Sequence, residues 1–371
     1  MALKIGIITL SASYNCGSML QSYALKTILA KYGEVEIINF TSDSSRKQYS
    51  IIPKNPLKLT YLKFTNSRIL EALRAEKADY TAFQRNCLMM QDKEYDINNL
   101  HEIKDKYDVV VAGSDQVWNV CMSDFDESFF CGWCGKHCKK VAYAPSLGGH
   151  DIRESPQKEK FIEYILDFDF LSTREEFGKK VLSDITARDI PKVLDPTLML
   201  QYADWENLVG SPLVHGDYIF YYSWAYCYGE LREVVAARSQ TTGLPVYVID
   251  AHKYRGNKLE GYDFILSRQG GPLAFLNLMR YAKEVYVESF HGMIFAYTFK
   301  KNFWLLDTHA NYEQLDSRLR EIVDLFKVRD RLIQVRSGTK PNLDAVMEYA
   351  DNETLRELKQ QSFSYLNKAF V

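Results

Sequence analysis

The sequence predicts an α/β protein of two doubly wound domains, each built on a parallel sheet with helices on both faces. Short apolar runs of strand length alternate with segments of helical apolar spacing, and the alternation occurs in two series. Several strands end in polar residues, as at the ligand-binding edge of a parallel sheet. Because 371 residues exceed one ordinary core, we expect domains at 1–205 and 213–340 and a helical tail at 341–371.

The bulk properties are those of a globular protein of the cytoplasm. A net charge of −2 argues against a dedicated nucleic-acid binder. An odd number of cysteines, seven, and the lack of a secretory signal before the first apolar run favour a reducing compartment. No apolar run is long enough to span a bilayer, so we expect any contact with the inner face of the membrane to be peripheral.

The first series opens with a strand–helix–strand unit. The strand, loop, helix and second strand are expected at 4–10, 11–18, 19–32 and 35–40. A right-handed crossover puts Asn15 and Gly17 at the carboxyl edge of the sheet. The loop lacks the three-glycine dinucleotide fingerprint, so no nicotinamide or flavin cofactor is predicted.

An insertion at 41–106 then interrupts the series. Its basic segment, 46–77, precedes helical spacing over 70–87. One interpretation is a surface that meets an anionic membrane or a large acceptor. An ordinary solvated helical excursion is favoured, because the charges are interspersed and acids are present.

Polar residues follow the next two strands, expected at 107–112 and 140–143. Ser114, Asp115 and Gln116 come after the first strand and Ser146 after the second. These groups are typical of a wall that binds a small polar ligand, although a side-chain-capped turn also explains the first three. Between the strands, Cys121 to Cys138 include four cysteines whose spacing is not the paired zinc pattern; a free-thiol cluster in a surface loop is favoured over a metal site.

Two charged residues complete the first domain. A helix is expected to begin after a capping Ser172, with Arg174 in its first turn. A cation there opposes the helix dipole, which makes Arg174 a ligand candidate. Asp195 follows a short strand and either binds an acceptor hydroxyl or fixes an Asp-Pro turn.

The second series starts after Gly210-Ser211-Pro212, which marks the expected domain boundary. Strands and helices alternate at 218–223, 230–240, 244–250 and 272–281. Arg268 lies in a glycine-rich turn that either grips an anion or simply reverses the chain. Helices are expected again at 317–326 and 352–369.

The stretch 284–299 organises the second domain. Residues 285–287 predict a buried strand, 288–292 a turn and the residues from Met293 a helix. A hydroxyl (Ser289), an imidazole (His291) and a glycine (Gly292) at such a turn suit an anion at the helix N-terminus. The alternative is that His291 only caps the helix.

An ordered set of motifs resembles the polysaccharide pyruvyl transferase family over nearly the whole chain. The motifs are Asn15-Cys16-Gly17-Ser18, Gly113-Ser114-Asp115-Gln116, Tyr143-Ala144-Pro145-Ser146, Ser172-Thr173-Arg174-Glu175, Leu194-Asp195-Pro196-Thr197, Ser289-Phe290-His291-Gly292 and Ser317-Arg318. Together with the two series, this predicts a GT-B-like architecture in which two Rossmann-like doubly wound domains face a central cleft.

The resemblance implies transfer of the pyruvyl group of phosphoenolpyruvate to two sugar hydroxyls as a ketal, without a metal or cofactor. His291 and Asp115 are the catalytic candidates, with His291 as general acid/base. Arg174, Ser289 and Gly292 would bind the donor, and the acceptor side would be lined by Asn15, Gly17, Ser114, Gln116, Ser146 and Asp195. The implied acceptor is a sugar of a bacterial capsule, exopolysaccharide or cell wall, often lipid-linked.

One position departs from the family pattern, in which an arginine often stands two residues before the histidine. Here that residue is Ser289, so Arg268 or Arg318 would have to supply the cation. Two alternatives therefore stay open: a GT-B glycosyltransferase that uses a nucleotide-sugar, and a carbohydrate-binding relative without catalysis.

Overall fold

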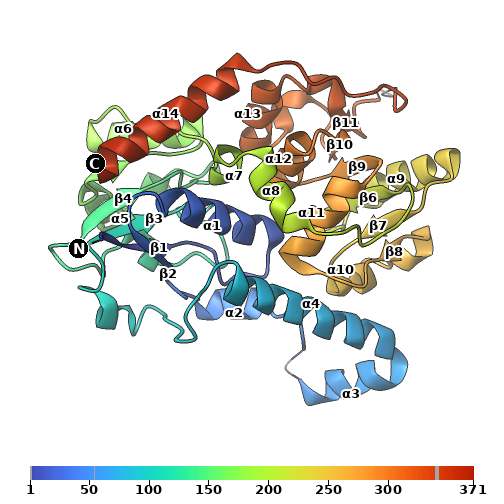
Figure 1. The fold of residues 1–371 in the computed structure, drawn as a ribbon, viewed down its shortest axis with the longest axis horizontal. Coiled ribbons are helices and arrows are strands. Elements are labelled where there is room, and N and C mark those ends of the chain that lie inside the picture. Colours follow the sequence, from blue (N-terminus) through green and yellow to red (C-terminus); the bar gives the residue numbers. More distant parts are fainter. Residues whose placement is uncertain (1, 54, 339–341) are drawn as a thin grey trace. The chain divides into compact units, whose positions relative to one another are not determined.

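The computed structural model describes residues 2–53, 55–338 and 342–371 (Figure 1). The chain divides into two compact units. Unit 1 comprises Met1–Ser50, Ala82–Leu200 and Glu353–Val371, and unit 2 comprises Ile51–Thr81 and Gln201–Asn352. Each unit is a parallel sheet with helices, which confirms the predicted class of fold.

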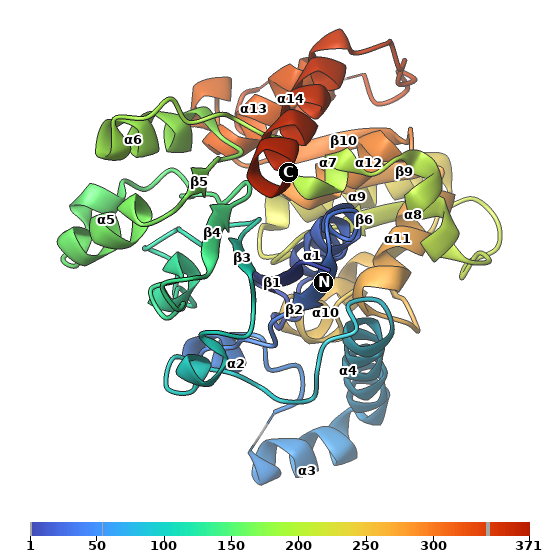
Figure 2. The same cartoon turned by 60° about the vertical axis from the view of Figure 1, so that its left-hand side comes forward.

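Unit 1 contains a five-stranded sheet in the order β2-β1-β3-β4-β5, with every pair parallel (Figure 2). The strands are β1 (Lys4–Ile8), β2 (Glu34–Ile37), β3 (Val109–Ala112), β4 (Lys139–Ala142) and β5 (Phe170–Leu171). The helices are α1 (Cys16–Leu29), α2 (Asp43–Gln48), α5 (Lys158–Leu166), α6 (Glu176–Thr186), α7 (Pro196–Met199) and α14 (Glu353–Phe370). Buried β-branched residues make the central strands, as both faces of the sheet are covered.

Unit 2 contains a six-stranded parallel sheet in the order β11-β10-β9-β6-β7-β8. Its strands are β6 (Ile219–Tyr222), β7 (Val246–Val248), β8 (Ile265–Leu266), β9 (Glu284–Val287), β10 (Asn302–Asp307) and β11 (Leu332–Gln334). Its helices are α3 (Pro56–Thr65), most of α4 (Ser67–Asn86), α8 (Tyr202–Val209), α9 (Gly229–Thr242), α10 (Ala251–Gly256), α11 (Gly271–Tyr281), α12 (Phe290–Thr298) and α13 (Ser317–Phe326).

Each sheet has a point at which its strand order reverses. In unit 1 the chain adds β2 on one side of β1 and then β3 on the other. In unit 2 it adds β7 and β8 beside β6 and returns to place β9 on the opposite side. Ligands of open parallel sheets bind outside the carboxyl ends of the two strands at such a switch point. The residues after β1 and β3, and those after β6 and β9, are therefore the first places to look for a site.

The compact units depart from the expected domain bounds in two segments. Residues 353–371, expected as a separate tail, belong to unit 1, where Tyr365 Oη donates to the carbonyl of Ala142 and Ser362 Oγ accepts from the amide of Leu194. Residues 51–81, expected within the first domain, belong to unit 2. The expected boundary between 340 and 341 lies outside the described residues.

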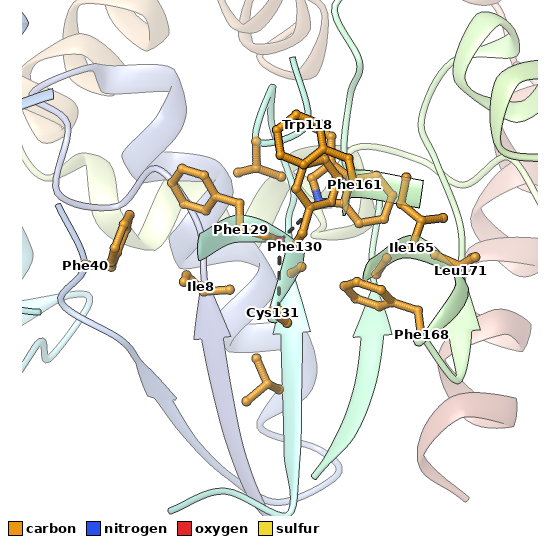
Figure 3. Close-up of a cluster of buried hydrophobic side chains, with 14 of the residues drawn as sticks. Ile8, Phe40, Trp118, Phe129, Phe130, Cys131, Phe161, Ile165, Phe168 and Leu171 are labelled. Carbon is orange, nitrogen blue, oxygen red and sulfur yellow. Dashed lines mark hydrogen bonds between the residues drawn. The ribbon is translucent and has the colours of Figure 1, made fainter. Parts of the chain in front are cut away.

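The core of unit 1 is an aromatic cluster on one side of its sheet (Figure 3). The indole N–H of Trp118 donates to the carbonyl of Phe129 at 3.1 Å, and Trp118 stacks on Phe130. Cys131 and Cys138 lie in this core rather than in the expected surface loop. Glycines and cysteines in the sequence suggested a loop, but the neighbouring Phe129 and Phe130 carry the segment inward.

Helix α4 is fastened to unit 2 by two carboxylates. Glu76 accepts from the amide of Ala251 at 2.9 Å, and Asp79 accepts from the amide of Gly270 at 2.9 Å. Both amides lie at the start of a helix, α10 and α11, where negative charge is favoured. Burial, followed by the charge of Asp250, raises the pKa of Glu76 from 4.5 to about 8; the hydrogen bond from the Ala251 amide and then the charge of Lys253 oppose this rise only in part.

We expect the stability of unit 2 to fall as the pH rises from about 4.5 to about 8. The carboxyl of Glu76 loses its proton near pH 4.5 in the unfolded chain but only near pH 8 in the folded chain. Between these values the folded state binds more protons, so the free energy of unfolding falls as the pH rises. The loss should reach about 5 kcal/mol, since each pKa unit is worth about 1.4 kcal/mol. Urea unfolding at several pH values measures it.

Glu76→Gln should remove most of this slope, because an amide does not ionise. Glu71→Gln is the matched control: Glu71 lies on the same helix and is exposed, so this variant should retain the slope. Equal slopes for the wild type and Glu76→Gln would contradict the expectation.

Candidate functional site

The first part of the candidate site in unit 1 is the N-terminus of α1. The predicted loop 11–18 is shorter than expected, because the helix already begins at Cys16. Asn15 has extended backbone angles, and its side chain accepts from the amide of Ser18 at 3.1 Å, as an N-cap does. Gly17 is buried in the first turn. The helix N-terminus therefore lies directly after β1, at the switch point.

The second part is the turn after β3. Gly113 has a φ of +112°, and a Cβ there would lie 2.3 Å from the carbonyl oxygen of Tyr143, so the turn requires glycine. Ser114 is fully buried and donates to the carbonyl of Ala144 at 3.0 Å. Gln116 accepts from Asn119 at 2.9 Å. The predicted ligand-facing hydroxyl of Ser114 thus ties this turn to the loop after β4, and the amide of Gln116 bonds within its own loop.

Asp115 joins these two parts. Its Oδ2 accepts from the hydroxyl of Ser18 at 2.7 Å, which links the turn after β3 to α1. Its Oδ1 accepts from a guanidinium nitrogen of Arg174 at 3.2 Å. Because the side chain of Asp115 is only 9% exposed, both bonds lie in surroundings of low dielectric.

Arg174 lies between two buried carboxylates. Its second terminal nitrogen donates to Asp195 at 2.6 Å, and the Arg174 and Asp195 side chains are 3% and 1% exposed. Burial alone would lower the pKa of Arg174, but the charges of Asp115 and Asp195 outweigh it and the pKa is raised. Asp195 also accepts from the amide and hydroxyl of Thr197, so it fixes the Asp-Pro turn as one of the two predicted alternatives required.

The expected helical position of Arg174 is wrong. Helix α6 begins at Glu176, and the hydroxyl of Ser172 bonds to the carbonyl of Ala142 instead of capping a helix. Arg174 therefore precedes the helix, and the argument from the helix dipole does not apply. A cation is needed at position 174 because Asp115 and Asp195 are buried beside it and require a partner charge.

A carboxylate that the sequence did not single out completes this network. Glu175 accepts from the hydroxyl of Ser146 at 3.0 Å and from the amide of Leu147 at 2.6 Å. Ser146 also donates its amide to the carbonyl of Asp115 at 2.7 Å. Unit 1 thus brings Asp115, Ser146 and Arg174 together in one network, whereas the family resemblance had assigned Arg174 to the donor and the other two residues to the acceptor side or to catalysis.

In unit 2 the candidate site is the N-terminus of α12. The helix begins at Phe290, so His291 and Gly292 lie in its first turn and not in a preceding turn as expected. Ser289 is the N-cap and accepts from the amide of Gly292 at 3.1 Å. A Cβ on Gly292 would lie 2.7 Å from Ser289 Oγ, so glycine permits this cap. His291 is 9% exposed.

Four residues at or beside this turn, Glu288, Tyr221, Ser223 and Trp224, were not singled out by the sequence reasoning. The carboxylate of Glu288 accepts from the hydroxyls of Tyr221 and Ser223, which lie at the end of β6 across the switch point. Burial raises the pKa of Glu288, and hydrogen bonds from these hydroxyls and the charge of Arg232 oppose the rise only in part. Trp224 follows Ser223 and is 59% exposed. The only signal in the sequence that could have identified these residues is their position at or just after the carboxyl end of a strand.

The two arginines proposed to replace the missing cation lie at different distances from His291. Arg268 is exposed and follows β8, three strands from β9, which corresponds to about 14 Å across the sheet. Arg318 lies in the first turn of α13, which follows β10, the strand next to β9. Its Nε and one terminal nitrogen donate to the two carboxylate oxygens of Asp316, at 3.0 and 2.6 Å. Position therefore favours Arg318, and Asp316 already neutralises much of its charge.

Among the described residues, no group of three or more His, Cys, Asp or Glu side chains is arranged to hold a metal ion. Cys131, Cys134 and Cys138 nevertheless lie close together, and a hydrogen bond from Cys131 followed by burial contributes to a raised pKa of the Cys134 thiol. Searched over the same described part of the chain, no helix has the length and apolar character needed to cross a membrane.

The architecture defined by these two units is that of GT-B proteins. The UDP-GlcNAc 2-epimerase of Methanocaldococcus jannaschii, solved with UDP-GlcNAc and UDP, is similar with a TM-score of 0.56 and 12% identity, covering 99% of this chain and 100% of that one. The enzyme of the same name from Neisseria meningitidis gives a TM-score of 0.50 and 9% identity, covering 99% and 93%. At these identities the likeness shows the fold alone.

The family is shown by sequence. The model of the polysaccharide pyruvyl transferases matches residues 15–310, so the chain belongs to the polysaccharide pyruvyl transferase family and is a transferase. The matched range contains every predicted site residue except Arg318. No curated protein matches the chain.

Proposed function

We propose that this protein transfers the pyruvyl group of phosphoenolpyruvate to two hydroxyls of a sugar, forming a cyclic ketal and releasing inorganic phosphate. The observation that carries the proposal is the position of His291. It lies within the range matched by the family and in the first helical turn after β9, at the switch point of the unit 2 sheet. A titratable group there suits a reaction that begins with proton transfer.

The reaction requires an acid and a base in turn. Protonation of the methylene carbon of phosphoenolpyruvate gives a methyl group and an oxocarbenium-like centre, which one sugar hydroxyl attacks as it loses its proton. Loss of phosphate regenerates the electrophilic centre, and the second hydroxyl closes the ketal and loses its own proton. His291 would donate the first proton and accept one from a hydroxyl, and Asp115 is the second catalytic candidate.

The donor is a multiply charged anion and needs partial positive charge around it. The first amides of α12, where Ser289 and Gly292 lie, would hold the phosphate. The charge of Arg232 acts on the carboxyl of Glu288, next to Ser289, and Arg318 lies after the neighbouring strand β10. Both arginines are therefore candidates to supply the positive charge that Ser289 lacks. We propose phosphoenolpyruvate as the only small-molecule partner and no metal or other cofactor.

The acceptor would be a sugar of a bacterial capsule, exopolysaccharide or cell wall, carried on a lipid. Asn15, Gln116 and the other polar residues after β1 and β3 would line the acceptor side. Such an acceptor would put the enzyme in the cytoplasm with a peripheral contact at the inner face of the membrane.

Calorimetric or thermal-shift titration with phosphoenolpyruvate, set against UDP-sugars, tests the proposal. A ligand at about 100 times its dissociation constant adds about 2.7 kcal/mol to stability, which is readily measured. We expect phosphoenolpyruvate to stabilise the wild type, and Arg232→Met and Arg318→Met to weaken this effect. Arg268→Met is the matched control, because Arg268 lies three strands away and should retain it.

Other outcomes would replace the proposal. Stabilisation by a UDP-sugar alone would indicate a glycosyltransferase of the same fold. A response to a glycan with none to phosphoenolpyruvate would indicate a carbohydrate-binding relative, for which Ser289 in the arginine position is the best argument.

A further inference from the structure

Helix α3 carries an apolar stripe that no described residue covers. Leu57, Tyr61 and Phe64 are 80%, 61% and 82% exposed. Their spacing of four and three residues puts them on one face of the helix. Exposed large apolar residues that gather in this way mark a surface used for binding.

The opposite face of α3 is fixed to the protein. Leu62 is 4% exposed and lies in a cluster with Ile69 and Leu70 of α4, against which Leu59 also packs. Asn55 caps the helix by accepting from the amide of Leu57, and Pro56 begins it. Figure 1 shows α3 joined by a short turn to the long helix α4. The stripe is therefore presented outward by a packed helix.

The chain segment that carries the stripe is basic in sequence. Residues 51–70 contain Lys54, Lys58, Lys63 and Arg68 and no Asp or Glu. Lys63 and Arg68 are exposed, and neither pairs with an acid among the described residues. Within the predicted basic segment 46–77, positive charge and exposed apolar surface thus coincide on this one helix.

We propose that α3 docks on the surface of an anionic lipid bilayer, with Leu57, Tyr61 and Phe64 entering the boundary between head groups and acyl chains. Apolar and aromatic side chains favour that boundary, and lysine and arginine favour anionic head groups. A second copy of the chain is a poorer occupant, because it would bring the same cations face to face. An acidic protein would match the charge but not account for three exposed apolar side chains as directly.

The proposal extends the proposed function by naming the surface through which the enzyme reaches a lipid-carried acceptor. Binding to vesicles needs neither phosphoenolpyruvate nor an acceptor. Failure of vesicle binding and failure of pyruvyl transfer are therefore separate results.

Co-sedimentation of the full chain with vesicles tests the docking surface. We expect binding to vesicles of phosphatidylcholine mixed with phosphatidylglycerol, weak binding to phosphatidylcholine alone, and weaker binding at high salt. The triple variant Leu57→Ser/Tyr61→Ser/Phe64→Ser should bind at least about tenfold less tightly, because each side chain loses apolar contact. Lys63→Glu/Arg68→Glu should also lose about tenfold or more.

Two substitutions outside the helix serve as matched controls. Val346 is 75% exposed and Lys158 is exposed, so Val346→Ser and Lys158→Glu make the same kinds of change elsewhere and should bind vesicles like the wild type. All the replaced side chains are exposed, and unchanged unfolding transitions would show that the variants fold.

Several results would overturn the proposal. These are no binding of the wild type to anionic vesicles, or binding that survives both α3 variants. Self-association in sedimentation equilibrium that the serine variant abolishes, without vesicle binding, would assign the stripe to a second copy. Capture of an acidic protein in place of lipid would assign it to a protein partner.

Discussion

Replacing His291 with alanine is expected to lower kcat for pyruvyl transfer by about 10² to 10⁴-fold while leaving the protein folded. This is the usual contribution of one positioned acid or base. His291 occupies the first turn of α12, beside the capping Ser289, so its imidazole adjoins the helix end that would hold the phosphate. Steady-state kinetics with saturating phosphoenolpyruvate measure the effect, and circular dichroism checks the fold.

A histidine outside the site serves as the control for the general effect of replacing a histidine with alanine. His252 lies on α10 of the same unit and is exposed, so His252→Ala should change kcat by less than about twofold. If His291→Ala retained wild-type kcat, His291 would not be the acid or base. If it raised KM with kcat unchanged, His291 would instead bind the substrate equally in the ground and transition states.

Replacing Arg174 with methionine is expected to lower the free energy of unfolding by about 3–5 kcal/mol. The substitution leaves Asp115 and Asp195 buried without their shared cation, and breaking a buried ion pair from one side costs this much. Urea unfolding followed by circular dichroism measures the loss. Arg153→Met is the matched control: Arg153 pairs with Asp151 but is 41% exposed, so this variant should lose less than about 1 kcal/mol.

A second substitution should recover part of that stability. Arg174→Met/Asp195→Asn removes one of the two uncompensated charges, and an asparagine can still accept the hydrogen bonds from Thr197 that fix the turn. The double variant should therefore be more stable than Arg174→Met. If Arg174→Met unfolded like the wild type and lost only phosphoenolpyruvate binding, Arg174 would be the donor ligand that the family resemblance implied.

The sequence predicted strands better than it predicted where helices begin. Buried strands such as β3 and β9 are short β-branched runs bounded by polar residues, and this pattern depends only on neighbouring residues. The starts of α1 and α12 were placed too late. The first turn of α1 is made of small residues and that of α12 contains His291 and Gly292, so neither shows the apolar spacing on which the prediction relied; the side chains of Asn15 and Ser289 cap these helices instead.

Long-range pairing was beyond the sequence pattern. Arg174 is separated by 59 residues from Asp115 and by 21 from Asp195, and no local spacing indicates that the three meet. The strand order brings them to one edge of the sheet. For the same reason Glu288 and Arg232 were missed. The catalytic and binding roles of the candidate residues stay predictions until the variants are measured.

The division of unit 1 among three segments has a consequence for biosynthesis. The chain passes between the units at residues 50/51, 81/82, 200/201 and 352/353. Because Ser362 and Tyr365 of α14 bond to Leu194 and Ala142, unit 1 cannot complete its packing on the ribosome until residues 353–371 have emerged. The sheet translated first is thus the one finished last. A nascent chain of this protein must keep the α14-binding surface of unit 1 from aggregating while all of unit 2 is made.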